Sequence, residues 1–172
     1  MTKYLIAILL STAFFLAKPT AAEEIQLDQL FSDLKSSKDQ LRARKLEGLI
    51  WQRWFESGND EIDALMQQAI KKRRIYDFNG SLSLLNRVIQ LKPEYAEAWN
   101  QRATVLFHQQ AYEKSLTDIA KALELEPRHF GAMAGRAMIR LYQNKPALAR
   151  QNISQALQYH PFLREREMFP GL

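Results

Sequence analysis

Three short runs of this sequence end in proline and recur at a constant interval: VIQLKP (residues 88–93), ALELEP (122–127) and ALQYHP (156–161). Their prolines, Pro93, Pro127 and Pro161, lie 34 residues apart. Self-similarity at such a period is typical of stacked helix–turn–helix units. The period therefore predicts an all-α solenoid, which offers an extended surface for holding partners and not a catalytic pocket.

The unit at residues 96–129 shows the repeat most clearly. It places large and small residues at fixed positions before its proline: Trp99, Ala103, Leu106, Ser115, Ile119, Ala122 and Pro127. Small residues let the two helices of a unit approach closely, and large ones fill the gap to the next unit. Proline ends the second helix. This pattern resembles the tetratricopeptide repeat (TPR), and the same frame fits residues 62–95 and 130–163. The resemblance implies a right-handed α-solenoid of three TPR units at residues 59–163.

The apolar residues ahead of the repeats predict a helical hairpin at residues 23–58. Four of them are spaced as one helical face: Leu27, Leu30, Phe31 and Leu34. A second apolar helix ends at Gly58, a C-terminal cap, and Asn59 or Asp60 caps the next helix. The hairpin stands in the place of an N-terminal capping repeat. We expect its Trp51 and Trp54 to pack against the first repeat and not to bind a ligand.

The first 22 residues have the layout of a secretory signal peptide. Lys3 precedes the apolar run 4–17, and small residues follow up to Ala22. Cleavage after Ala22 is favoured, with Ala21 nearly as good. The alternative is an uncleaved membrane anchor, although the run is shorter than the roughly 20 residues that span a bilayer.

Charge and composition exclude several function classes. Removing residues 1–22 lowers the net charge from +5 to +3, which does not argue for nucleic acid. The chain has no cysteine, which excludes a lipoprotein, disulfides and cysteine-based zinc sites. No metal motif, nucleophile elbow or phosphate loop is present, so we predict no catalytic residue, no metal site and no cofactor.

A closer resemblance rests on three features together. They are the signal peptide, the sequence IWQRWFESG (50–58) and the sequence EPRHFGA (126–132). The combination is similar to small exported TPR proteins of alphaproteobacteria. This resemblance implies a periplasmic location, a role in envelope integrity and no catalytic residues. In another cell type the same signal would mean secretion.

The TPR resemblance also implies which side chains line the concave groove. Positions two, five, nine, twelve and thirteen of each unit point into it, and the candidate binding residues among them are Met66, Arg73, Arg74, Asn100, Thr104, Phe107, His108, Met138 and Tyr142. Apolar anchors and polar groups in such a groove suit an extended or helical peptide. The carboxylate clamp of some TPR proteins is not expected, because Met66, Ile70, Gly131 and Gly135 occupy its positions.

Two charged features have alternative interpretations. The run KKRR (71–74) is a solvated helix face, or it contacts an acidic partner or an anionic envelope surface. Arg102 stands where TPR units usually have leucine, and we expect it to pair with Asp118 of its own unit.

The C-terminal tail, residues 164–172, is too short for a full capping helix. Either the last repeat exposes apolar surface that invites a homodimer or a partner, or Met168 and Phe169 fold back over it. The main hypothesis is a non-enzymatic periplasmic scaffold that binds envelope proteins or peptides in its groove. The alternatives are a binder of anionic lipid or polysaccharide and, last, an envelope enzyme.

Overall fold

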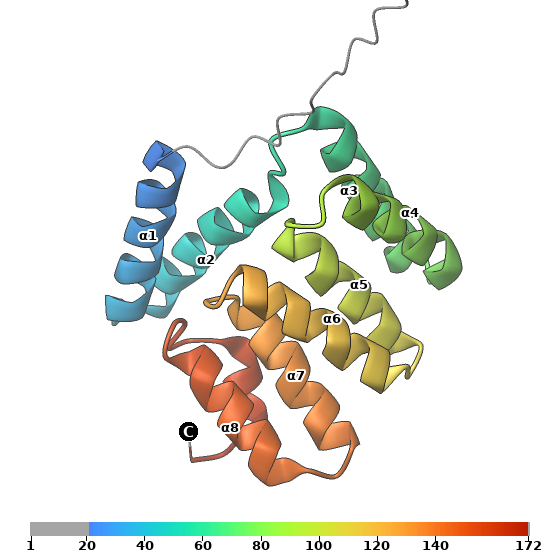
Figure 1. Ribbon diagram of the computed structural model, residues 1–172. Coiled ribbons are helices and arrows are strands. Elements are labelled where there is room, and N and C mark those ends of the chain that lie inside the picture. Colours follow the sequence, from blue (N-terminus) through green and yellow to red (C-terminus); the bar gives the residue numbers. More distant parts are fainter. Residues whose placement is uncertain (1–20, 172) are drawn as a thin grey trace, which may run out of the picture.

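The computed structural model describes residues 21–171, which form paired α-helices and no β-strand (Figure 1). The elements are α1 (Ala21–Ser36), α2 (Gln40–Phe55), α3 (Asp60–Arg74), α4 (Phe78–Leu91), α5 (Ala96–His108), α6 (Tyr112–Leu125), α7 (Phe130–Tyr142), α8 (Pro146–Leu157) and the 3-10 helix η1 (Arg164–Met168). The predicted signal peptide lies outside the described residues, except that α1 begins at Ala21. Within residues 21–171 no helix is long and apolar enough to cross a membrane.

The pairs α3–α4, α5–α6 and α7–α8 follow one another as a stack, which confirms the predicted all-α solenoid. A buried serine joins the two helices in the first two pairs. Ser81 Oγ donates to the carbonyl of Ala69 at 2.8 Å, and Ser115 Oγ donates to the carbonyl of Ala103 at 2.7 Å. The small side chains allow the close approach that these hydrogen bonds need.

The predicted pair within the second unit is formed. Arg102 donates through Nε and Nη2 to the two carboxylate oxygens of Asp118, at 2.7 and 2.8 Å. Its Nη1 donates to Asn86 of the preceding unit, and its guanidinium lies 4.8 Å from the Trp99 ring centroid. Two hydrogen bonds to one buried carboxylate satisfy the guanidinium donors, which explains why Arg102 can stand where TPR units usually have leucine.

The turns at the helix ends use side-chain caps and left-handed backbone. α2 ends at its C-cap, Glu56, two residues before the predicted Gly58, and Gly58 adopts φ +77° in the turn that follows. Asn59 caps α3 by accepting a hydrogen bond from the Ile62 amide at 3.1 Å.

The α1–α2 hairpin contacts the first repeat through Phe55, but its two tryptophans pack elsewhere than predicted. The Trp54 ring lies 4.9 Å from the Phe130 ring and stacks on His129, the N-cap residue of α7, with centroids 4.0 Å apart. Trp51 packs edge-on against Phe130 at 5.7 Å. Both tryptophans therefore pack on the third unit, and the expectation that they pack on the first is wrong. Space for Trp51 comes from Gly131, where an added Cβ would lie only 2.7 Å from the Trp51 ring. In Figure 1 the hairpin lies beside the start of α5.

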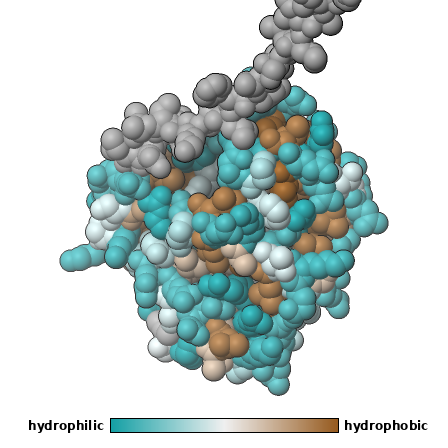
Figure 2. All heavy atoms as spheres, in the orientation of Figure 1, coloured by the Kyte–Doolittle hydropathy of each residue, from teal (hydrophilic) through white to brown (hydrophobic). Residues whose placement is uncertain are grey.

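The C-terminal tail folds back in part. Leu163 and Phe169 are buried and share one core with the hairpin, whereas Met168 is 51% exposed. Arg150 Nη2 also donates to the Pro170 carbonyl at 3.0 Å. Of the two residues that were expected to fold back over the last repeat, Phe169 does so and Met168 does not. Figure 2 shows the molecule from the same side as Figure 1, with hydrophilic side chains around an apolar area near the centre of this face.

Candidate functional site

Helix α2 closes one half of the predicted groove. It packs on the third unit through Trp54, and its last residue, Phe55, packs on the core of the first unit. It therefore crosses the N-terminal halves of the helices that line the concave face. Met66 is fully buried and Asn100 is nearly so, which makes the prediction that they contact a partner wrong for this structure.

A buried polar cluster lies beneath α2. Glu97, only 1% exposed, has its carboxylate 2.8 Å from His129 Nε2, and it accepts hydrogen bonds from Asn100 and Gln101 at 3.2 and 2.6 Å. His129 Nδ1 in turn accepts from the Ala132 amide. These partners satisfy groups that would otherwise be costly to bury. The cluster joins α5 to α7 under the Trp54 ring and is closed to ligands.

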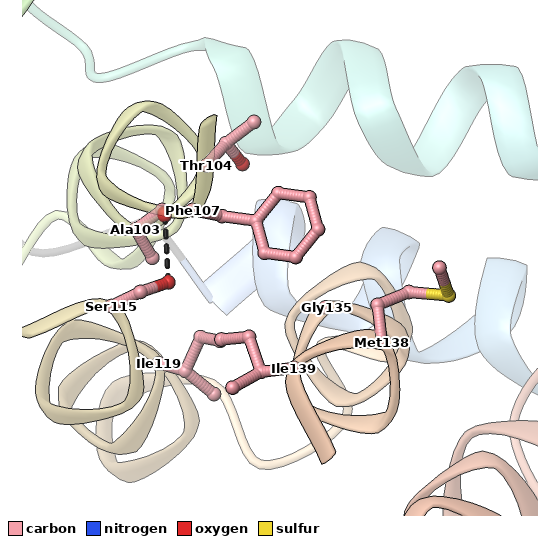
Figure 3. A pocket seen from close by; sticks show the side chains of 8 residues that line it. All are labelled: Ala103, Thr104, Phe107, Ser115, Ile119, Gly135, Met138 and Ile139. Carbon is pink, nitrogen blue, oxygen red and sulfur yellow. Dashed lines mark hydrogen bonds between the residues drawn. The ribbon is translucent and has the colours of Figure 1, made fainter. Parts of the chain in front are cut away.

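The other half of the groove is open and contains a small apolar pocket between α5, α6 and α7 (Figure 3). Its volume is ≈ 110 Å³, enough for one apolar side chain. The lining residues are Ala103, Thr104, Phe107, Ser115, Ile119, Gly135, Met138 and Ile139. Figure 3 shows the Phe107 ring extending from α5 toward α7, the helix that carries Met138. Three predicted site residues, Thr104, Phe107 and Met138, are thus brought together.

Aromatic side chains border this pocket. Phe107 lies 5.4 Å from the Tyr142 ring and 5.8 Å from the Tyr112 ring, and the two tyrosines stack 5.9 Å apart. Tyr142, predicted from the sequence, is 63% exposed at the rim. Such amphipathic rings supply contact area with little loss of conformational entropy.

His108 extends the aromatic border toward the first unit. Its exposed ring stacks on Phe78 at 5.6 Å with an interplanar angle of 6°. Partial burial, and then the nearby Arg73 cation, lowers the pKa of His108. The uncharged ring is therefore favoured there near neutral pH.

The basic run at residues 71–74 does not form one solvated face. Lys72 pairs with Asp77 at 2.6 Å, and Arg73 is half-buried. Burial, and then the adjacent Arg74, lowers the pKa of the Arg73 guanidinium. Lys71 and Arg74 are exposed. Of the two predicted arginines, Arg73 faces the groove near His108, while Arg74 lies at the surface.

Sequence reasoning missed the aromatic residues that begin the second helix of a unit. Phe78 and Tyr112 are the first residues of α4 and α6, and they occupy equivalent repeat positions. That recurrence was visible in the sequence, but the groove positions considered all lay on the first helix of each unit. Gly135 was also missed, although its lack of a side chain leaves the pocket open.

Known proteins share both the repeat and the fold. A family model described as tetratricopeptide repeat matches residues 96–129. A TPR repeat-containing protein of Rhizobium etli is 43% identical over 94 residues, which cover 55% of this chain and 46% of that protein. The chain thus spans about half the length of this relative.

Two solved structures show a similar fold at low sequence identity. The first TPR domain of Spaghetti (RPAP3), bound to an HSP90 peptide, is 16% identical with a TM-score of 0.59, over 62% of this chain and 85% of that one. YrrB, a TPR protein with an unusual peptide-binding site, is 14% identical with a TM-score of 0.59, over 88% and 87%. This chain therefore carries a tetratricopeptide repeat and has the fold of tetratricopeptide-repeat proteins, with a relative in an alphaproteobacterium.

Proposed function

We propose that this protein is a non-enzymatic interaction module that binds a segment of another protein at the open half of its concave face. The observation that carries the proposal is the apolar pocket with an aromatic border, which stays accessible after α2 has covered the rest of the groove. Pockets of this kind hold an anchoring apolar side chain, and nearby polar groups fix the register of the bound segment. The peptide bound by the TPR domain of Spaghetti and the peptide-binding site of YrrB support this class of ligand.

We further propose that the protein works in the periplasm and that its partners are envelope proteins. The support is the signal-peptide pattern of residues 1–22. Fractionation of the native cells, with N-terminal sequencing of the mature protein, tests this location. A mature chain that begins at Glu23 or Ala22 in the periplasmic fraction supports it, and a cytoplasmic full-length chain contradicts it.

Site-specific photo-crosslinking in cells tests the binding site itself. A photoreactive residue at Tyr142, on the rim, is expected to capture a partner that the same residue at Leu41 does not. Leu41 is a matched control because it is equally exposed, at 63%, and lies on α2. Gly135→Leu, which fills the pocket, should remove the Tyr142 crosslink. Identical crosslinks at both positions, insensitive to Gly135→Leu, would contradict the proposed site.

Binding to an anionic surface is the second hypothesis, and the structure gives it less support. Lys72 is engaged with Asp77 and Arg73 is half-buried, so two of the four cations remain exposed. Salt separates the two hypotheses, because surface binding weakens steeply between low and moderate salt while contacts in an apolar pocket persist.

A further inference from the structure

Six aromatic rings form a continuous line of contacts across all three repeats, which ends in a triangle of Phe107, Tyr112 and Tyr142. In spatial order they are Tyr76, Phe78, His108, Phe107, Tyr112 and Tyr142, and successive ring centroids are 6.0, 5.6, 5.8, 5.8 and 5.9 Å apart. We call this line the aromatic row. Its residues come from the ends of α5 and α7, the starts of α4 and α6, and the turn between α3 and α4. The row therefore continues from the pocket border beyond the concave groove, toward the first unit.

The ends of the aromatic row contribute little to the core. Tyr76 is 79% exposed and Tyr142 is 63% exposed, and both belong to the small set of large hydrophobic residues that are exposed in the described part of the chain. Single exposed aromatic residues are ordinary on protein surfaces, but contiguous ones mark interaction surfaces. The exposed ends thus indicate contacts that are made outside this chain.

The backbone at Tyr76 strengthens this argument. Tyr76, Gln110 and Asn144 occupy the same turn position in the three units, with φ of +62°, +60° and +55°. Glycine or asparagine suits this left-handed conformation, whereas a bulky residue is strained in it. Since the Tyr76 ring is largely exposed, burial does not offset that strain. The left-handed backbone belongs to the turn in every unit, so what sets Tyr76 apart is a bulky, exposed ring at that position, and this favours a role in binding.

An uncompensated cation lies beside the row. The guanidinium of Arg73 makes no hydrogen bond or ion pair among the described residues, and its Nε is buried without a partner. It is close enough to influence His108. Glu97, the acidic group that acts on it, is already bound to His129 and Gln101. A half-buried guanidinium is stabilised by a carboxylate that hydrogen-bonds to it, and no carboxylate of the described residues does so here.

We propose that the aromatic row binds an extended, acidic segment of a partner protein. One apolar side chain of the segment enters the pocket below Phe107, a carboxylate pairs with Arg73, and the segment ends against Tyr76. An extended backbone follows a line of rings across three units, which a single helix contacts only in part. The inference rests on the proposed function, because it names the chemistry of the segment held there.

Selection from a random peptide library, displayed on phage, tests the chemistry without knowledge of the partner. The protein expressed from its full sequence is the bait, and affinities of the selected peptides are then measured by fluorescence anisotropy. We expect selected peptides to be enriched in Asp and Glu next to an apolar residue. Arg73→Gln should weaken their binding about tenfold or more, because a charge-assisted hydrogen bond is lost.

Tyr76→Gly tests the row itself, and Gln110→Gly is its matched control. Both substitutions relieve the same left-handed backbone, but only the first removes a ring of the row. We expect Tyr76→Gly to weaken binding several-fold with a melting temperature at or above that of the wild type. Gln110→Gly should leave binding unchanged.

Each outcome decides between the two proposals. Wild-type affinity in Arg73→Gln and Tyr76→Gly, with binding lost in Gly135→Leu, would overturn this inference and leave the proposed function standing. Selection of neutral or basic peptides would also overturn it. If no peptide is selected, or if soluble polysaccharide fragments bind instead, both proposals fall.

Discussion

Two glycines one helical turn apart on α7 should respond in opposite directions to the same substitution. An added Cβ at Gly131 would lie 2.7 Å from Cη2 and 2.9 Å from Cζ2 of Trp51. At Gly135 the added Cβ would lie 3.6 Å from Cδ1 of Ile119, an ordinary van der Waals distance. We therefore expect Gly131→Ala to destabilise the protein and Gly135→Ala to stabilise it.

The magnitudes follow from helix propensity and packing. Alanine is favoured over glycine in a helix interior by about 0.8–1 kcal/mol, and partial burial of the methyl group at Gly135 adds a few tenths, for a total of about 1–1.5 kcal/mol. At Gly131, in the first turn, the propensity gain is smaller. Trp51 must shift there, and overpacking costs about 1–3 kcal/mol, which leaves a net destabilisation of roughly 1–2 kcal/mol.

Urea denaturation followed by circular dichroism measures both changes, and 1 kcal/mol corresponds to about 2–4 °C in the melting temperature of a chain of this size. Gly48→Ala is the matched control: it lies inside α2 with no atom within 4 Å of the added Cβ, so it reports the propensity contribution alone. In a Trp51→Ala background the cost of Gly131→Ala should disappear. If Gly131→Ala is as stable as the wild type, the packing of the hairpin on the third unit is refuted.

Two further predictions concern buried and half-buried charges. Arg102→Leu should lower the free energy of unfolding by roughly 2–4 kcal/mol, because it leaves the Asp118 carboxylate, 5% exposed, without its partner. The double variant with Asp118→Leu should recover most of this loss. A single variant that is as stable as the wild type would show that the pair is dispensable. The second concerns Glu47, whose pKa is lowered by the His160 ring, with Nε2 of the ring 3.2 Å from Oε2 of Glu47. Since the folded pKa lies below the unfolded one, this stabilisation is complete above the ordinary carboxyl pKa and is lost as the pH falls through the lowered folded value. Glu47→Gln should therefore flatten the loss of stability below about pH 4.5, as measured by denaturant titrations at several pH values, and an unchanged pH dependence would contradict this role.

What could be predicted from the sequence depended on how far apart the interacting residues lie. Arg102 and Asp118 belong to one unit, so the register of the repeat was enough to pair them. The proline period and the small residues also act locally, within a unit or between neighbours. Trp54 and His129 lie in segments far apart in the sequence, and a repeat pattern carries no information on such a contact.

The candidate site was predicted in part for the same reason. Thr104, Phe107, Met138 and Tyr142 were identified because they sit at recurrent positions of the first helix in each unit. Met66 was misassigned because the pattern does not show which half of the groove another segment covers. The glycine at position 131 was a visible signal, since only a residue without a side chain leaves room for a tryptophan there.

The contact between the hairpin and the third unit ties the first helices to the last. In an ordinary repeat array each unit touches only its neighbours, so units can be added or removed and the array can unfold from either end. Here an inserted or deleted unit would separate Trp54 from His129, and fraying of either end would expose the same shared core. The number of repeats is therefore fixed by this closure. The chain should fold and unfold as one cooperative unit, more slowly than its helical content alone implies, because the closing contact is between distant parts of the sequence.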